Sequence, residues 1–173
     1  MTLPALEQAA FAYLERYASS AENLRRVLMR RIERAARAEA ITREEGRARI
    51  DALIARLEAN RLLDDKQYAE ARARSLSRQG RSSARIAQRL AAKGVNAEAA
   101  KAAVGAVIED GHSDLRAALA LARRRRLGPF RAKADRKERR GRDMAVLGRA
   151  GFSFEIARKV IDAESPAALE DEL

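Results

Sequence analysis

Arg61-Leu62-Leu63-Asp64-Asp65-Lys66-Gln67-Tyr68-Ala69 is the stretch that decides the fold of this 173-residue chain. The apolar pair Leu62-Leu63 is suited to close one helix against a core. The acidic pair Asp64-Asp65 offers a side chain that caps the next helix by accepting backbone N–H bonds. Tyr68-Ala69 then opens a new buried stripe. The stretch therefore predicts a joint between two copies of one helical module.

One helical plan occurs three times along the chain. The residues just before the third helix of each copy come into register at intervals of 54 (95 − 41) and 57 (152 − 95) residues: Ile41, Val95 and Phe152. Each is followed by a residue suited to cap a helix start: Thr42, Asn96 and Ser153. Thr42 with Glu45 also fits a capping box. The recurrence predicts three tandem three-helix repeats.

Apolar residues support the same register inside the helices. The second helices align through Leu24 and Leu28, Ile86 and Leu90, and Met144 and Leu147. The third helices align through Ile50, Leu53 and Ile54, then Val104, Val107 and Ile108, with Ile161 in the last copy. The first copy has eight more residues, around 32–40, which we expect to lengthen its second helix. Three short helices bury little apolar area alone, so neighbouring copies must cover one another.

The residues that follow the opening stretch carry a family resemblance. They are Arg74-Ser75, Arg78, Gly80, Ser82-Ser83-Ala84-Arg85-Ile86, Leu90 and Lys93-Gly94-Val95. Together with Leu62-Leu63-Asp64-Asp65 they resemble the RecX family, the small regulators of the bacterial recombinase RecA. Arg61 stands where the family usually has Gly, and Tyr68 where it has Phe. The resemblance covers roughly residues 5–162 and is strongest in the second repeat.

The fold class expected is all-α: an elongated curved array of three tandem three-helix repeats. Ala, Leu, Arg and Glu are strong helix formers, and no segment alternates apolar and polar residues as a strand would. We expect the first repeat at residues 1–60, the second at 61–110 and the third at 111–163. An acidic tail follows at 164–173.

Charge is unevenly placed along the chain, which carries +11 overall. Residues 116–142 hold twelve Arg or Lys against two acids, a net +10. A field this concentrated favours a polyanionic partner: DNA, RNA, an acidic protein groove or a nucleoprotein filament. Few aromatic residues accompany these basic residues, and Phe130 is expected to be buried. Contact with phosphates is therefore favoured over the stacking of bases.

Fourteen basic residues are candidates for contact with a filament or DNA. They are Arg74, Arg78, Arg85, Arg89, Lys93, Arg123, Arg124, Arg125, Arg126, Lys133, Arg136, Lys137, Arg139 and Arg140. The residues from Arg74 to Lys93 could equally form a solvated helix face. The run 123–126, just before Gly128-Pro129, could instead complement a helix dipole. Because that effect is worth only about 1 kcal/mol or less per charge, we favour a partner surface for the run.

Several classes of chemistry find no support in the sequence. The absence of cysteine excludes disulfides and thiol catalysis. His112, the single histidine, is expected in a solvated loop, and Asp64-Asp65 is expected to cap a helix rather than to bind metal. No cofactor, and no catalytic or metal-binding residue, is expected. With no leader and no apolar stretch long enough to cross a bilayer, a cytoplasmic location is expected.

The resemblance implies a non-enzymatic regulator that binds the RecA–DNA filament. Its implied roles are in homologous recombination, DNA repair and the SOS response, through inhibition or modulation of RecA. Direct contact with phosphates of single- or double-stranded DNA is open, and a monomer is the default. The alternative is an architectural DNA-binding protein that contacts phosphates without RecA. An RNA-associated adaptor with another protein partner is more distant.

Overall fold

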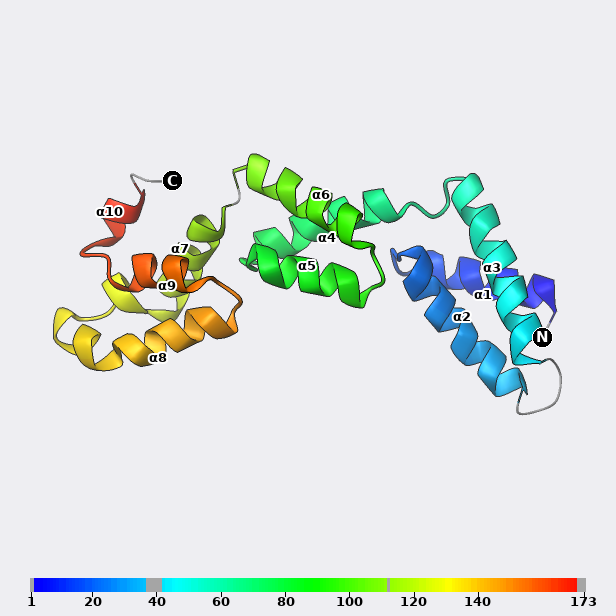
Figure 1. The fold of residues 1–173 in the computed structure, drawn as a ribbon, viewed down its shortest axis with the longest axis horizontal. Helices are drawn as coiled ribbons and strands as arrows, with labels where there is room; N and C mark the ends of the chain where they lie inside the picture. The colour runs from blue at the N-terminus through cyan, green and yellow to red at the C-terminus, as the bar shows by residue number, and fades with distance from the viewer. Residues whose placement is uncertain (1, 37–41, 112, 171–173) are drawn as a thin grey trace. The chain divides into compact units, whose positions relative to one another are not determined.

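The computed structural model describes residues 2–36, 42–111 and 113–170, and within them the chain is helical with no β-strand. The α-helices are α1 (Leu3–Leu14), α2 (Ala21–Ala36), α3 (Arg43–Ala59), α4 (Asp65–Arg78), α5 (Ser83–Ala92), α6 (Ala97–Glu109), α7 (Asp114–Arg125), α8 (Arg136–Arg149), α9 (Phe154–Ile161) and α10 (Pro166–Glu170). Two 3-10 turns, η1 (Gly128–Phe130) and η2 (Lys133–Asp135), separate α7 from α8. The all-helical prediction is confirmed (Figure 1).

The predicted caps lie at the predicted helix starts. The Thr42 hydroxyl accepts from the Glu45 backbone N–H at 3.2 Å, and the Glu45 carboxylate accepts from the Thr42 N–H at 3.1 Å, which completes the capping box. Asn96 accepts from the N–H of Ala99 at 2.8 Å. At the remaining starts Ser153 caps α9, and Asp64 caps α4. Each cap satisfies a backbone donor that the first helical turn leaves without a partner.

The chain divides into two compact units. Unit 1 comprises Met1–Ala69 and Leu90–Ala99, and unit 2 comprises Glu70–Arg89 and Ala100–Leu173. The division passes through α4, α5 and α6, so it differs from the three repeats expected from the sequence. The repeat boundaries after residues 60, 110 and 163 stay a prediction.

Unit 1 is built on a core that α1, α2 and α3 share (Figure 1). Its largest buried side chains are Leu6, Leu24, Leu28, Ile32, Ile50, Leu53, Ile54 and Leu57. Gly46 lets α3 approach α2 closely, because a Cβ atom there would lie 2.3 Å from Cγ2 of Ile32. The predicted apolar register of Leu24, Leu28 and Ile50 is confirmed.

The longer first copy extends its second helix, as predicted. Helix α2 has 16 residues where α5 has 10, and Ile32 in the added part is fully buried. The added residues therefore enlarge the core of unit 1. The rest of the insertion (37–40), the register residue Ile41 and the single histidine His112 lie outside the described residues.

Unit 2 is built on a core that α7, α8 and α9 share with η1 (Figure 1). Leu147, Phe152 and Ile161 are buried, as predicted. Asp143 lies four residues before Leu147, as Leu24 lies before Leu28 and Ile86 before Leu90, and it is buried. Met144, which the sequence alignment matched to Leu24 and Ile86, is only half-buried.

Buried Asp143 is stabilised by hydrogen bonds. Its carboxylate accepts from the Gly128 N–H at 2.9 Å and from the Arg131 guanidinium at 3.0 Å. This pairing holds the pKa of Arg131 above its usual value. A charge in the core is tolerated because both oxygens have partners. The charge fastens the η1 turn to α8.

Two predicted core residues prove to be exposed. Leu62 is 55% exposed while Leu63 is buried, because Arg61 adopts a left-handed conformation (φ +56°) that ends α3 and points the second leucine inward. Ile108 is 47% exposed. The buried stripe of α6 instead runs through Ala100, Ala103 and Val107, at the spacing of three and four residues that one helix face requires. Every helix in the described residues is too short or too polar to cross a membrane.

Candidate functional site

Two adjoining hollows in unit 2 form a cleft lined by arginines. One, of about 550 Å³, lies among the residues after α4, the last turns of α7 and the end of α8. The other, of about 440 Å³, lies between α4 and α7. Gly80 and Arg124 line both. We call the two together the arginine cleft, after its lining arginines: Arg78, Arg81, Arg116, Arg124, Arg125 and Arg149.

The backbone turn after α4 shapes one wall of the arginine cleft. Gly80 takes a left-handed conformation (φ +72°), and its N–H donates to the carbonyl of Ser77 at 2.7 Å. The next N–H, of Arg81, donates to the carbonyl of Leu76 at 3.2 Å. This pattern ends α4 and satisfies its last carbonyls, so the turn is a fixed part of the helix end. It places Arg81 on the cleft wall.

The opposite wall comes from α7 and α8. Arg124 and Arg125 lie in the last turn of α7, and Arg149 is the last residue of α8. Cations are favourable at both places because the C-terminal end of a helix carries partial negative charge. The helix dipoles thus offset part of the repulsion among the clustered cations.

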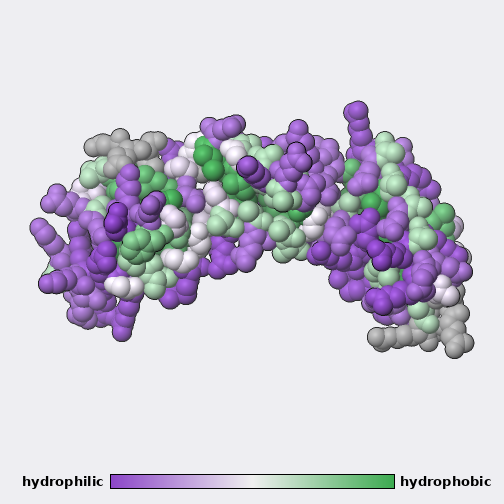
Figure 2. Space-filling model, viewed as in Figure 1, coloured by the Kyte–Doolittle hydropathy of each residue, from purple (hydrophilic) through white to green (hydrophobic). Residues whose placement is uncertain are grey.

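The side chains that line the arginine cleft are basic or uncharged. Among the described residues, no Asp or Glu lines either hollow. Arginine guanidinium groups bind phosphate or carboxylate through two parallel hydrogen bonds, and a concave wall of one charge attracts ions of the other. Figure 2 shows hydrophilic side chains over much of unit 2, interrupted by apolar ones. The arrangement is suited to bind an anion that carries several charges.

Three of the predicted contact residues meet in the arginine cleft: Arg78, Arg124 and Arg125. Sequence reasoning missed three others: Arg81, Arg116 and Arg149. A signal for two of them was present, since Arg81 directly follows Gly80 and Arg149 lies two residues before Gly151, at helix ends. Arg116 gave no such signal, because it lies in the first turn of α7.

Other predicted residues are engaged within unit 2. Arg123 pairs with Glu170 and lies over the ring of half-buried Phe130, with 5.5 Å from its guanidinium carbon to the ring centroid. Arg136 donates to the carbonyls of Pro129 at 2.8 Å and Glu164 at 2.9 Å. These side chains fix the turns that flank α8. They contribute to the fold of unit 2 through contacts other than the helix-dipole interaction considered for the run 123–126.

Arg140 binds Asp162 through two hydrogen bonds, both of 2.6 Å, and so fastens α8 to the end of α9. The bond to Arg140 holds the pKa of the Asp162 carboxyl below its ordinary value, and Asp162 raises the pKa of Arg140 in turn. A bidentate pair of this kind is directional as well as attractive. The main role of Arg140 is therefore to hold α8 against the end of α9.

The remaining predicted residues lie at the surface. Arg74, Arg85 and Arg89 are exposed on α4 and α5 of unit 2, whereas Lys93 belongs to unit 1. Arg126, Lys133 and Lys137 are exposed, and half-buried Arg139 lies 3.8 Å from Glu138. Within the described residues, no three His, Asp or Glu side chains are grouped to hold a metal ion.

Comparison with known proteins places this helical protein with its arginine cleft among regulatory proteins. The family model described as the second three-helix domain of RecX matches residues 64–104. The Regulatory protein RecX of Myxococcus xanthus (strain DK1622) is 49% identical over 160 residues, which cover 91% of this chain and 84% of the relative. The chain belongs to the RecX family.

A second relative matches over a shorter stretch. The Regulatory protein RecX of Agrobacterium fabrum (strain C58 / ATCC 33970) is 41% identical over 99 residues, 57% of this chain and 51% of the relative. No solved structure matches the chain. The resemblance drawn from residues 61–95 is confirmed at the level of the family.

Proposed function

We propose that this protein regulates the RecA recombinase by binding the RecA–DNA filament, without catalysing a reaction itself. Membership of the RecX family supports a regulatory role. The acid-free arginine cleft of unit 2 is the observation that carries the proposal, because a filament of protein and DNA presents closely spaced negative charges. The protein acts as a monomer in the cytoplasm, in recombination and DNA repair.

The arginine cleft contributes the phosphate-binding part of this activity. Its guanidinium groups come from the C-terminal ends of α4, α7 and α8 and from the first turn of α7, so they meet a flexible backbone at several points instead of one. Contacts of this kind carry no sequence preference and weaken as salt rises, because each phosphate contact releases bound counterions. The fastened arginines Arg123, Arg136 and Arg140 add to the surrounding field.

The test measures the DNA-dependent ATPase rate and the strand-exchange rate of RecA as this protein is added. We expect both rates to fall at near-stoichiometric or lower ratios, since one molecule that binds a filament affects several subunits. Unchanged rates, with the protein folded and in excess, would refute the proposal. Co-sedimentation with RecA filaments and with bare single-stranded DNA, at matched salt, identifies the bound species.

A second function is favoured by the same cleft. An architectural protein would use the cleft on phosphates and need no RecA. The two proposals differ in the co-sedimentation result: the regulator binds the filament more tightly than bare DNA, and the architectural protein binds both alike. Variants of Arg124 and Arg149 distinguish a role of the cleft from a role of other surfaces in either case.

A further inference from the structure

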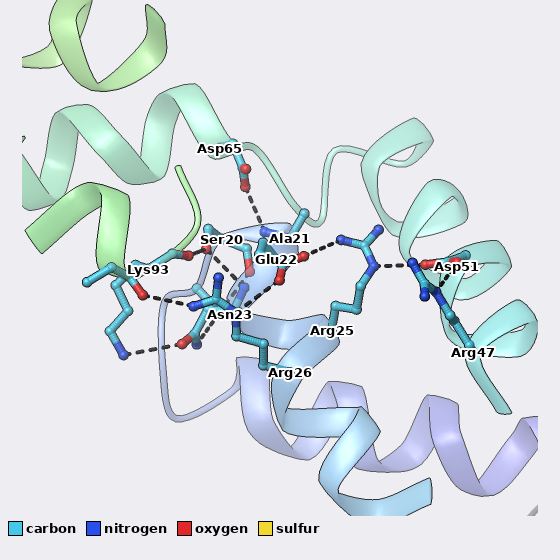
Figure 3. A network of polar contacts seen from close by, with 12 residues as sticks. Ser20, Ala21, Glu22, Asn23, Arg25, Arg26, Arg47, Asp51, Asp65 and Lys93 are labelled. Atoms are coloured by element: carbon cyan, nitrogen blue, oxygen red, sulfur yellow. Dashed lines mark hydrogen bonds and ion pairs between the residues drawn. The ribbon is translucent and has the colours of Figure 1, made fainter. Parts of the chain in front are cut away.

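In unit 1, the start of α2 is fastened to residues far along the chain (Figure 3). The hydroxyl of Ser20 donates to the carbonyl of Lys93, at the end of α5. The next backbone N–H, of Ala21, donates to Asp65 Oδ1 at 2.7 Å, at the start of α4. One helix start is thus held by two other helices.

Unit 2 has the same set of contacts at the start of α5. The hydroxyl of Ser82 donates to the carbonyl of Ala150 at 3.1 Å, at the end of α8. The next backbone N–H, of Ser83, donates to Asp114 Oδ1 at 2.7 Å, at the start of α7. Atom types, order along the chain and the N–H distance all agree with those of unit 1.

An arginine strengthens each set at an equivalent carbonyl. In unit 1 Arg26 donates to the carbonyl of Ala92 at 2.9 Å, and in unit 2 Arg85 donates to the carbonyl of Arg149 at 2.8 Å. Both acceptors directly precede the carbonyl that the serine binds. The arginines lie six and three residues after their serines, so two different positions on a helix reach the same acceptor.

A glycine without room for a side chain completes each set. Gly94 and Gly151 follow the bound carbonyls, with φ of +79° and +90°. A Cβ atom on Gly94 would lie 2.3 Å from Cγ of Glu22, in the first turn of α2. A Cβ atom on Gly151 would lie 2.6 Å from Oγ of Ser82. The close approach depends on glycine in both units.

We propose that these contacts are one repeated fastening, the seam, and that in unit 2 the seam positions the arginine cleft. The seam consists of a serine hydroxyl, the next N–H, a carboxylate, an arginine and a glycine. In unit 2 the two carbonyls that it holds belong to Arg149 and Ala150, which line one wall. Ser82 directly follows Arg81, which lines the other.

The seam therefore sets how far apart the cleft walls lie. Arg81 and Arg149 reach the same hollow only while Ser82 holds the end of α8. Ser82 and Asp114 are positioning residues on this view, since neither lines the hollow that Arg81 and Arg149 share. The part of the proposal that concerns the cleft rests on the proposed function of the preceding section.

Matched variants in the two units test the inference. Ser82→Ala and Asp114→Ala break the seam of unit 2, and Ser20→Ala and Asp65→Ala break that of unit 1. We expect all four to lower the melting temperature. Only the unit 2 pair should also weaken binding of a mixed-sequence single-stranded oligonucleotide, several-fold at low salt. Glu155→Ala removes a first-turn acid outside both seams and should leave the oligonucleotide affinity unchanged.

Variants of the arginine cleft separate failure of the seam from failure of the proposed function. If Arg124→Gln and Arg149→Gln weaken oligonucleotide binding but the unit 2 seam variants do not, the positioning role is refuted and the proposed function stands. If neither set weakens binding, the phosphate-binding role of the cleft is refuted as well. Ser82→Thr keeps a hydroxyl and should restore much of the affinity that Ser82→Ala loses.

Glycine variants provide an independent test of the seam itself. Gly94→Ala and Gly151→Ala add both a strained conformation and a clash. Gly111→Ala adds the strain alone, because Gly111 has φ +80° and nothing within 4 Å of an added Cβ. We expect Gly94→Ala and Gly151→Ala to speed amide hydrogen exchange at the starts of α2 and α5, and Gly111→Ala to leave both unchanged. Equal losses of melting temperature for all three would overturn the seam.

Discussion

Unit 1 and unit 2 differ in charge far more than in construction. Unit 1 holds 14 basic and 12 acidic residues, a net charge of +2, and unit 2 holds 22 basic and 13 acidic residues, a net charge of +9. Both are helical, with cores of Leu, Ile and Ala. A helical core of this size therefore does not require the surplus charge. The excess in unit 2 is consistent with the proposed polyanionic partner.

The arginines of unit 1 show the opposite use of the same residue. Arg25 donates to Asp51 at 2.8 Å and to Glu22 at 2.8 Å, and Arg26 also binds Glu22 (Figure 3). These bonds hold the pKa of the Glu22 carboxyl below its usual value. Unit 1 balances its arginines with acids, and unit 2 leaves a lined cleft without them.

The largest effect on stability should come from substitutions in the two cores, which are built alike. Leu28→Ala in unit 1 and Leu147→Ala in unit 2 each remove a fully buried side chain, so each should lower the free energy of unfolding by about 2–5 kcal/mol. Denaturant unfolding measures the loss, and hydrogen exchange locates it. Leu62→Ala, at a 55% exposed side chain, is the control and should cost far less. A negligible loss at Leu28 or Leu147 would contradict the assigned core.

The close approach of α2 and α3 should distinguish unit 1 by its packing. Gly46→Ala places a methyl group against Ile32 and should destabilise the protein by about 1–3 kcal/mol, as overpacking does. Gly141→Ala in α8 is the matched control, with nothing within 4 Å of the added atom. Since alanine favours helix, that control should stabilise by up to about 1 kcal/mol. Thermal melts of both variants give the comparison, and a gain from Gly46→Ala would contradict the packing.

Two triple variants test whether the arginine cleft or the net charge determines oligonucleotide binding. Replacing Arg124, Arg125 and Arg149 with Gln should weaken oligonucleotide binding at low salt. It should also flatten the slope of log affinity against log salt by about 2, at about 0.7 per lost phosphate contact. Replacing exposed Arg30, Arg31 and Arg34 of unit 1 with Gln removes the same charge and should change the slope much less. Equal changes would mean that net charge, and not the cleft, determines binding.

Acid should remove a small stabilising contribution from each unit, that of Glu22 in unit 1 and that of Asp162 in unit 2. Because Glu22 and Asp162 have lowered pKa values in the folded protein, each contributes stability above its unfolded-state pKa. That stability is lost as the pH falls through the folded-state pKa. Glu22→Gln and Asp162→Asn should therefore lower the melting temperature at neutral pH and make no difference in strong acid. Both carboxylates are more than a third exposed, so the changes should be small. A melting-temperature loss that grows toward acid would contradict the assigned pairs.

Local signals in the sequence predicted much of this fold. Thr42, Asn96 and Ser153 cap helices as expected, because capping depends on one side chain and a backbone N–H only three residues away. Leu28, Leu90 and Leu147 are buried because helical periodicity determines which face packs. The same periodicity misplaced Ile108, where a difference of one residue turns a side chain by 100° or so around the helix.

Contacts between segments that are far apart in the chain could not be predicted from the sequence. No local signal marks Asp143 as buried, and its partners Gly128 and Arg131 can be recognised only once α8 and η1 are packed together. The cleft arginines Arg81 and Arg149 are 68 residues apart in the chain (149 − 81) and come together through folding. Local composition indicated a basic region, but it could not predict which arginines would line a hollow.

The seam has a consequence for how such a chain can grow. Residues 61–110 contain its accepting side, Asp65 with Lys93 and Gly94, and its donating side, Ser82 with Ser83. A tandem duplication of this cassette would therefore supply complementary partners at the new junction from the first generation, with no further mutation. We expect a chain in which residues 61–110 occur twice to fold with three seams. A duplicated α1–α3 segment starts at Thr2 and Leu3 and has no carboxylate equivalent to Asp65 or Asp114. We expect it to leave one copy without a seam. We therefore expect residues 61–110 to be the segment of this chain that tolerates duplication.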